Sequence, residues 1–378
     1  MIPFNKPFLT GKETAYIKQA VESGKISGDG IFTKKCHAFF ESKYGFRKAL
    51  LTTSCTDALE MAALLLNIQP GDEVIAPSYT FVSTVNAFVL RGANIIFADS
   101  SKDSPNIDVT KIESLITPRT KAIVPVHYAG IACDMDAIMD IAKRHNLYVV
   151  EDAAQCIDAY YKGRPLGSIG HLSAFSFHET KNIISGEGGM LVINDPSFIN
   201  RAEIIREKGT NRSAFFRGEI DKYGWVDIGS SFLPSEVIAA FLYAQLENLS
   251  KIQAKRMFAW ETYHEQLKPL AAKGYFEMPF IPPYATNNAH IYYIVCKNPK
   301  DREGIISALK KEEIYAVFHY LSLHKSVYYQ EKHRGEELPN ADHFSDCLIR
   351  LPMYYDLSER DIMQVVKVIK KYFNGSAQ

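Results

Sequence analysis

Residues 134–154 read DMDAIMDIAKRHNLYVVEDAA, and this stretch decides the fold class. Its first part, up to residue 146, is apolar at helical spacing, with acidic residues at its start and basic residues at its end. That order of charges stabilises a helix through its dipole. Its second part, LYVVED, is a short apolar run with two valines and is typical of a buried strand. A helix that leads directly into a buried strand predicts an α/β fold.

The same alternation of helical and apolar segments extends from residue 50 to residue 195. Helical patterns cover residues 57–68 and 83–93. The apolar runs lack strict alternation, so they predict a mostly parallel sheet with helices on both faces. The expected strands are residues 48–53, 74–78, 94–100, 121–130, 147–154, 173–177 and 189–195.

The pattern changes after residue 235. A long helical stretch covers residues 235–270, and Ser235 is a candidate N-cap for it. The segments beyond it predict a smaller α+β domain, so we expect two domains, residues 1–250 and 251–378. In the second domain we expect strands at 290–297 and 315–323 and helices at 301–313 and 358–373.

The composition excludes several classes of function. The 378 residues carry 43 Lys and Arg against 43 Asp and Glu. A neutral chain gives no reason to expect nucleic acid or a membrane surface as a partner. Its longest apolar runs are too short to cross a bilayer, and its start lacks the pattern of a signal peptide. The six cysteines have no CxxC or CxxH spacing, so we expect reduced thiols in a cytoplasmic protein, without a metal site.

Two charged residues follow predicted strands, and ligands of open α/β sheets bind outside the carboxyl ends of strands. Asp152 ends one strand, and a buried carboxylate there needs a metal, an arginine or a protonated ring nitrogen opposite. Lys181 follows the strand at 173–177 and precedes SGEGG, whose glycines let the backbone approach a ligand. Taken alone, Lys181 is better interpreted as an exposed lysine, because most lysines are exposed, than as a nucleophile whose pKa is lowered by desolvation.

Smaller groups near other strand ends complete the set. TTSCTDAL, residues 52–59, places hydroxyl groups and free backbone amides at a helix start, which suits either a phosphate or a plain N-cap. Tyr79 and Phe81 offer aromatic rings after another strand. A lysine, an acid, a helix start and an aromatic ring together are the parts that hold pyridoxal 5′-phosphate. No GxGxxG or GxxxxGK[ST] motif is present, so a dinucleotide site or a P-loop is not expected.

Several motifs, in their order along the chain, resemble those of a known family. They are SCTDALEMAALLL, VVEDAAQ, SFHETKNIISGEGG, REKGTNRSAFF and HYLSLH. Over nearly its whole length the chain resembles the DegT/DnrJ/EryC1/StrS sugar-nucleotide aminotransferases. The resemblance implies the fold type I, aspartate-aminotransferase-like architecture: a large domain with a mostly parallel seven-stranded sheet, and a smaller C-terminal α+β domain. It also implies pyridoxal 5′-phosphate as cofactor and a homodimer with its sites at the subunit interface.

The resemblance assigns roles to the matching positions around the cofactor. Lys181 would be the catalytic lysine and would bind the cofactor covalently. Asp152 would pair with the pyridine nitrogen and Gln155 with the ring hydroxyl, while Phe81 would stack on the ring. Contacts to the phosphate are implied for Cys55, Thr56 and Ser176.

Other positions are implied in substrate binding or in contacts across the dimer. Many family members have Gly-x-Asn-x-Arg where this chain has GSSFL, residues 229–233. Ser231 would therefore replace an asparagine that reaches the phosphate of the neighbouring subunit's cofactor, and this departure leaves the contact open. The segment GTNR, residues 209–212, reads either as a helix end or as a substrate contact from a neighbouring chain. Substrate contacts are implied for Asn211, His319, Tyr320 and His324.

Within the family, SFHETKN and DIGSSFL are most similar to members that aminate a dTDP-sugar at carbon 4. The implied reaction uses L-glutamate and dTDP-4-dehydro-6-deoxy-D-glucose and gives dTDP-4-amino-4,6-dideoxy-D-galactose and 2-oxoglutarate, for a surface polysaccharide such as enterobacterial common antigen. Amination that gives the gluco epimer, amination at carbon 3 and a pyridoxal-phosphate dehydratase remain alternatives. Family dehydratases carry histidine in place of the lysine, so Lys181 disfavours that reading. Lys181, Asp152 and Gln155 together disfavour a non-catalytic relative.

Overall fold

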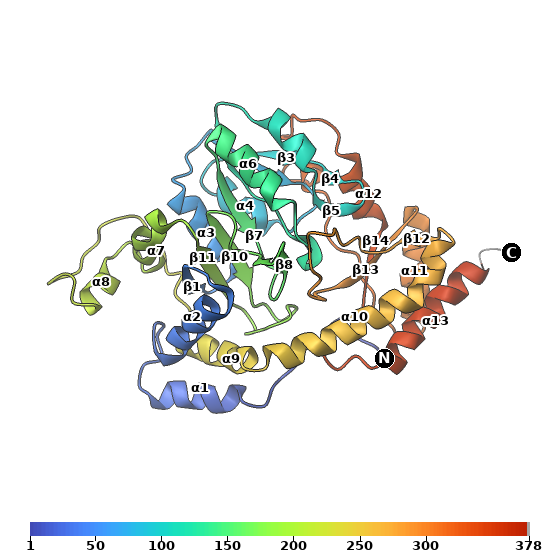
Figure 1. Cartoon of the computed structure of the whole chain (residues 1–378), viewed down its shortest axis with the longest axis horizontal. Helices are drawn as coiled ribbons and strands as arrows, with labels where there is room; N and C mark the ends of the chain where they lie inside the picture. The colour runs from blue at the N-terminus through green and yellow to red at the C-terminus, as the bar shows by residue number, and fades with distance from the viewer. Residues whose placement is uncertain (376–378) are drawn as a thin grey trace.

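The computed structural model describes residues 1–375, and a seven-stranded sheet lies at its centre (Figure 1). In order across the sheet, the strands are β1 (Lys48–Thr52), β11 (Gly189–Ile193), β10 (Leu172–Ser176), β7 (Tyr148–Asp152), β6 (Thr120–Ile123), β2 (Glu73–Pro77) and β3 (Asn94–Ala98). Within this sheet β11 runs antiparallel to its neighbours β1 and β10, whereas the pairs from β10 to β3 are parallel. The prediction of an α/β fold with a mostly parallel sheet is confirmed.

The sheet separates two apolar cores, because successive side chains of a strand point to opposite faces. In β2, Val74 packs into one core and Ile75 into the other. The first core includes side chains of α3 (Cys55–Leu65) and continues into the C-terminal part of the chain. Side chains of α2 (Ile31–Tyr44), α6 (Met135–His145) and α9 (Glu236–Leu246) fill the second core. Helices therefore cover both faces of the sheet.

The stretch from residue 134 to residue 154 folds as its pattern predicts. The carboxylate of Asp134 caps α6 by accepting a hydrogen bond from the Ala137 amide at 3.4 Å. The helix ends at Asn146, which has a left-handed conformation with φ of 52° that asparagine tolerates. The chain then enters β7, whose last residue is Asp152 at the carboxyl edge of the sheet.

In the described residues after α9, a smaller antiparallel sheet and four α-helices form the C-terminal part (Figure 1). Ser235 caps α9 as predicted, because its hydroxyl accepts a hydrogen bond from the Ile238 amide at 3.5 Å. The single helix expected over residues 235–270 is divided at Glu247 and Asn248. The division into domains at residue 250 stays a proposal. The elements are α10 (Leu249–Ala272), β12 (Phe276–Glu277), β13 (Tyr292–Cys296), α11 (Pro299–Lys311), α12 (Pro339–Cys347), β14 (Leu348–Leu351) and α13 (Glu359–Gly375).

The strand predicted over residues 315–323 does not form. Only Val317 pairs there, through an isolated antiparallel bridge to Arg350. Neighbouring side chains of a strand point to opposite faces, but the rings of His319 and Tyr320 stack with centroids 3.6 Å apart. The prediction was wrong because both rings turn to the same side, which a regular strand forbids.

Shorter elements connect these layers. No helix within residues 1–375 combines the length and the apolar character that crossing a bilayer needs. The connecting helices are α1 (Glu13–Glu22), α4 (Ser83–Val89), α5 (Val109–Ile112), α7 (Ile199–Arg206) and α8 (Arg212–Phe216). The 3-10 turns are η1 (Glu113–Leu115), η2 (Tyr128–Gly130), η3 (Pro196–Phe198) and η4 (Leu323–Lys325). Two strand pairs complete the fold, β4 (Ser100–Ser101) with β5 (Ser104–Ile107) and β8 (Tyr160–Tyr161) with β9 (Arg164–Pro165).

Candidate active site

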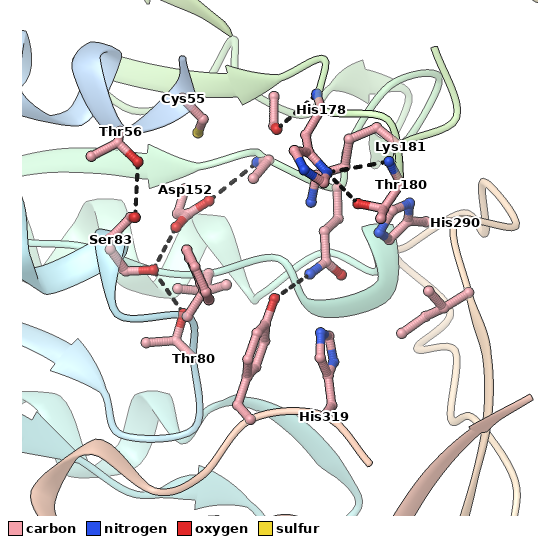
Figure 2. A pocket seen from close by; sticks show the side chains of 18 of the residues that line it. Cys55, Thr56, Thr80, Ser83, Asp152, His178, Thr180, Lys181, His290 and His319 are labelled. Carbon is pink, nitrogen blue, oxygen red and sulfur yellow. Dashed lines mark hydrogen bonds between the residues drawn. The ribbon is translucent and has the colours of Figure 1, made fainter. Parts of the chain in front are cut away.

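A cavity of about 550 Å³ lies at the carboxyl ends of the central strands and extends to the C-terminal sheet (Figure 2). Asp152 and Ser176 reach it from the ends of β7 and β10. The loops after β1 and β2 contribute further residues, and the C-terminal part closes the other side. Nine of the twelve predicted site residues line this cavity: Cys55, Thr56, Phe81, Asp152, Gln155, Ser176, Lys181, His319 and Tyr320.

Lys181 extends into the cavity from the loop that follows β10 (Figure 2). Its backbone amide donates to the His178 carbonyl at 2.9 Å, which holds the loop in a turn. Among residues 1–375, its Nζ has neither a hydrogen bond nor an ion pair. Burial lowers the pKa of Lys181, while electrostatic interactions with Cys55 and Asp152 partly offset that effect. The structure therefore holds an amine that gives up its proton more readily than an exposed lysine.

The Asp152 carboxylate is held by hydroxyl and amide donors. Its Oδ2 accepts a hydrogen bond from the Thr84 hydroxyl at 2.7 Å, and its Oδ1 accepts one from the Ala154 amide at 3.1 Å. Thr84 in turn lies 2.7 Å from the Thr80 hydroxyl. No arginine or lysine in the described part of the chain forms an ion pair with Asp152. Because a carboxylate can accept about four hydrogen bonds, it retains acceptor capacity for a cationic N–H in the cavity.

The start of α3 supplies backbone amides that have no partner. Ser54 is the N-cap, and its hydroxyl accepts a hydrogen bond from the Asp57 amide at 3.0 Å. The amides of Cys55 and Thr56 have no acceptor within residues 1–375, so they can bind an anion. A Cβ at Gly189 would lie 2.2 Å from the Ser54 carbonyl carbon. This glycine therefore allows β11 to pass close to the helix start.

Gln155 connects the two sides of the cavity. Its Oε1 accepts a hydrogen bond from the Ala129 amide at 2.6 Å, and its Nε2 donates to the Tyr320 hydroxyl at 3.0 Å. His319 stacks on Tyr320 and bonds through Nδ1 to the Tyr128 hydroxyl at 2.6 Å. Phe81 lies 6.1 Å from the Tyr320 ring and is 55% exposed, so its face is free to stack on a ligand. One amide hydrogen of Gln155 also remains free.

His290 is a cavity residue that sequence analysis missed. Asn182 donates through Nδ2 to Gln253 Oε1 at 2.8 Å and to the Asn288 carbonyl at 2.9 Å, so its Oδ1 faces His290. His290 Nδ1 therefore carries a proton, and its Nε2 is an acceptor. Burial lowers the pKa of His290 well below its ordinary value, and the charge of Lys181 lowers it further.

The other missed residues include Thr80, Ser83, Thr84, His178, Thr180 and Arg350, all of which line the cavity. Thr84 could have been found, because it lies in the first turn of the helix that follows the YTF motif. Thr56 donates to Ser83 at 2.8 Å, which ties that helix to α3. Arg350 and His290 lie on or beside strands of the C-terminal sheet, and no local pattern links those strands to the cavity.

Asn211 and Ser231 lie outside this cavity, in the segment between α7 and α9. That segment projects away from the sheet with α8 near its tip (Figure 1). Asn211 Oδ1 accepts a hydrogen bond from the Gly224 amide at 2.8 Å, and Ser231 forms an isolated bridge with Glu207. Their expected contacts involve a neighbouring subunit, so their roles stay predictions.

His324 also lies outside the cavity, although a direct substrate contact was expected. The side chain is buried, and its Nδ1 is 2.8 Å from the Ser78 hydroxyl at the end of β2. Its Nε2 lies 3.7 Å from Asp342 Oδ1. His324, Glu337 and Asp342 form a group of possible metal ligands, but Lys325 Nζ already lies 2.5 Å from Asp342. This geometry supports a bracing role for His324 and gives no direct contact to a ligand in the cavity.

The sequence was compared with family models and with known proteins. The family model described as the DegT/DnrJ/EryC1/StrS aminotransferase family matches residues 7–370. The spore coat polysaccharide biosynthesis protein SpsC of Bacillus subtilis strain 168 is 33% identical over 387 aligned residues, covering 99% of this chain and 98% of SpsC.

Two solved structures are similar over nearly the whole chain. Helicobacter pylori PseC, an aminotransferase involved in the biosynthesis of pseudoaminic acid, has a TM-score of 0.90 at 26% identity, with 99% of each chain covered. Spr1654 from Streptococcus pneumoniae has a TM-score of 0.91 in its PMP-form at 25% identity, with 99% of this chain and 100% of Spr1654 covered. The same protein is also known in a PLP-form, with a TM-score of 0.89.

Proposed function

The chain belongs to the DegT/DnrJ/EryC1/StrS aminotransferase family and is a pyridoxal-phosphate-dependent sugar aminotransferase, and from this we propose its substrates. The amino donor is L-glutamate, and the acceptor is dTDP-4-dehydro-6-deoxy-D-glucose. The amine is placed at carbon 4 and gives dTDP-4-amino-4,6-dideoxy-D-galactose, for surface polysaccharide biosynthesis in the cytoplasm. The likeness of SFHETKN and DIGSSFL to transaminases of this specificity supports the proposed substrate. The proposed reaction rests on Lys181, the amine that extends into the cavity without a partner among residues 1–375.

The residues around the cavity fit pyridoxal 5′-phosphate. Lys181 offers an amine without a partner, and the free amides of Cys55 and Thr56, with the Ser176 hydroxyl, suit a phosphate. Asp152 retains acceptor capacity for a protonated ring nitrogen, and Phe81 has a free aromatic face. We assign these residues to the cofactor. Gln155 is assigned to the ring hydroxyl through its remaining amide hydrogen.

The bound cofactor supplies an electron sink that stabilises negative charge on the carbon that loses its proton. Lys181 Nζ would hold the cofactor covalently, and with the donor bound in its place it would be a free amine. That nitrogen would accept the proton that the α-carbon of the donor loses, and in the second half-reaction it would deliver a proton to carbon 4 of the sugar. Its lowered pKa keeps a lone pair available for these transfers. Asp152 would keep a proton on the ring nitrogen, and Thr84 orients the carboxylate.

We further propose that the enzyme works as a homodimer. The segment between α7 and α9 projects from the body of the molecule (Figure 1). It exposes large apolar side chains. Phe216 is 68% exposed and Trp225 is 83% exposed. Exposed apolar side chains grouped in one segment suit contact with a second copy, to which Asn211 and Ser231 would contribute. Sedimentation analysis tests this proposal, and an active protein that stays monomeric would contradict it.

The substrate is tested by incubating the holoenzyme with L-glutamate and dTDP-4-dehydro-6-deoxy-D-glucose and solving the product structure by NMR. The expected product has an axial amine at carbon 4. An equatorial amine at carbon 4 would show that the product is the gluco epimer. An amine at carbon 3 would show that the enzyme aminates carbon 3. A deoxygenated sugar without an amine would indicate a dehydratase. If no aminosugar forms, the proposed substrate is wrong.

A further inference from the structure

Three side chains that can bind a metal ion meet outside the cavity, where η4 comes close to the start of α12. They are His324, Glu337 and Asp342, and their candidate ligand atoms all lie within 4.8 Å of one another. His324 Nε2 is 3.7 Å from Asp342 Oδ1. Two ligands of one tetrahedral zinc ion lie about 3.4 Å apart, because each is about 2.1 Å from the ion. The three side chains are therefore close enough to bind a single ion after small side-chain movements.

His324 directs an unpartnered nitrogen toward this group. Its side chain is buried, and its Nε2 has no hydrogen-bond partner in the described part of the chain. Its Nδ1 lies 2.8 Å from the Ser78 hydroxyl. Burial lowers the pKa of His324, which favours the neutral ring, and a ring that donates from Nδ1 to Ser78 has a free lone pair on Nε2. Metal-binding histidines are typically held by such a hydrogen bond from their other ring nitrogen.

The charges near His324 also favour a cation. Lys325 Nζ lies 2.5 Å from Asp342 Oδ2 and 4.0 Å from Glu337 Oε2. The hydrogen bond to Asp342 and the charges of Asp342, Glu337 and Asp346 raise the pKa of Lys325, so three carboxylates surround one ammonium group. Since Lys325 binds Oδ2 of Asp342, Oδ1 stays available to a metal ion. Three carboxylates and one ammonium leave two negative charges, which a divalent cation would balance.

We propose that His324 Nε2, Asp342 Oδ1 and the Glu337 carboxylate bind a zinc ion, with water at the fourth position. One imidazole and two carboxylates suit zinc, whereas Mg²⁺ prefers oxygen ligands alone. His324 is anchored to the end of β2 through Ser78, and Asp342 lies in the first turn of α12. The ion therefore fastens the C-terminal part to the central sheet. None of the six cysteines takes part, so their spacing gives no sign of this site.

Calorimetric titration of the holoenzyme with zinc chloride measures this site directly. We expect the wild-type protein to bind a single zinc ion per chain. His324→Gln removes the buried nitrogen ligand, so zinc affinity should fall on the order of 100-fold. Glu337→Gln removes an oxygen ligand and should weaken binding about tenfold. The Glu337 side chain is exposed, so this variant also decides the question if His324→Gln does not fold.

Lys325→Met should bind zinc more tightly, a gain that misfolding cannot produce. The ammonium group of Lys325 repels a metal ion next to Asp342, so its removal should raise zinc affinity roughly tenfold. A matched control comes from His145, a histidine on the surface whose Nε2 lies 2.7 Å from Glu113 Oε1. His145→Gln removes a histidine next to a carboxylate without touching the proposed site, and it should leave zinc affinity unchanged.

Zinc should also stabilise the folded protein. At about 100 times its dissociation constant, zinc should raise the thermal midpoint of the wild-type holoenzyme by about 3 °C, and that of His324→Gln by less than about 1 °C. The proposal would be overturned if the wild-type protein binds no zinc, binds Mg²⁺ equally well, or binds zinc no better than His324→Gln does. An unchanged affinity in Lys325→Met would also overturn it. The titration uses no substrate, so its outcome does not depend on the proposed transamination.

Discussion

The two walls of the cavity differ in how their polar groups are satisfied. On the wall formed by the ends of the central strands, Asp152 already accepts two hydrogen bonds from the protein, and Gln155 uses both ends of its amide. On the C-terminal wall, Arg350 Nε has no partner, and His290 Nε2 accepts no hydrogen bond from residues 1–375. Pre-bonded groups suit a cofactor that stays in one orientation. Unpaired groups suit two substrates that occupy the same cavity in turn.

Removing Lys181 should have the largest effect, because it eliminates the group that lies between the two walls. For Lys181→Ala we expect the transamination rate to fall on the order of 10⁴-fold. The absorbance of the lysine-bound cofactor should disappear. Initial rates and an absorbance spectrum measure both effects. Lys162→Ala serves as the control, since Lys162 is exposed and pairs with Asp136. A Lys181→Ala protein with wild-type turnover would remove the basis of the assignment.

Asp152→Asn tests the wall that holds the cofactor. The neutral amide keeps the size of the side chain but cannot hold a proton on a ring nitrogen, so we expect kcat to fall on the order of 100-fold. Both half-reactions should slow. Stopped-flow rates of each half-reaction provide the measurement, and the exposed Asp136→Asn provides the control. An effect confined to the glutamate step would contradict the division between the two walls.

Thr84→Val should weaken that same wall more mildly. The substitution removes the hydroxyl that donates to Asp152 at 2.7 Å, and a hydrogen bond to a charged group is worth enough to reduce cofactor affinity about tenfold. Titration of the apoenzyme with pyridoxal phosphate measures this affinity. Thr262→Val removes an exposed hydroxyl bonded to the Phe258 carbonyl and should change nothing. Unchanged affinity in Thr84→Val would mean that Asp152 needs no orienting donor.

The two walls should also shift the pKa of Lys181 in opposite directions. After the dominant effect of burial, Asp152 raises the pKa of Lys181 and Arg350 lowers it. The midpoint of cofactor capture by the apoenzyme, followed against pH, should therefore lie below that of an exposed lysine. It should move to lower pH in Asp152→Asn and to higher pH in Arg350→Met. If the midpoint shifts in the same direction in both variants, the charge of at least one of these two residues does not control the pKa of Lys181.

The lowered pKa of Lys181 determines how the stability of the apoenzyme changes with pH. The folded state binds its Lys181 proton less tightly than the unfolded chain does, so protonation of Lys181 disfavours folding. Stability of the apoenzyme should rise as pH increases through the folded pKa and level off above the unfolded one. Lys181→Ala should abolish this part of the pH dependence, which urea denaturation at several pH values can measure.

Much of the central wall could be predicted from the sequence. Asp152, Ser176 and the start of α3 follow strands, and parallel strands bring their carboxyl ends to one edge of a sheet whatever lies between them. Local order was therefore sufficient to bring Cys55, Asp152 and Lys181 together. The hydroxyl of Thr84 was missed, although it lies close to the YTF motif. Its hydrogen bond to Asp152 depends on how the first turn of α4 is oriented toward the end of β7.

The C-terminal wall of the cavity could not be predicted from the sequence in the same way. A strand was predicted over residues 315–323, but the stacking of His319 on Tyr320 requires an irregular backbone. His324, five residues after His319, was expected in the same site and instead braces β2 through Ser78. Nothing in the spacing of these residues distinguishes a ring that enters the cavity from one that packs behind it.

The sequence by itself determined the α/β class, the mostly parallel sheet and the residues at the carboxyl ends of its strands. These follow from periodicity and from short segments, in which each residue's neighbours along the chain decide its conformation. Only the tertiary structure decided that Arg350 and His290 face Lys181, more than a hundred residues away. Their positions depend on how the C-terminal sheet packs against the central one, and that packing is set by burial of apolar surface, which is non-directional and leaves no local pattern.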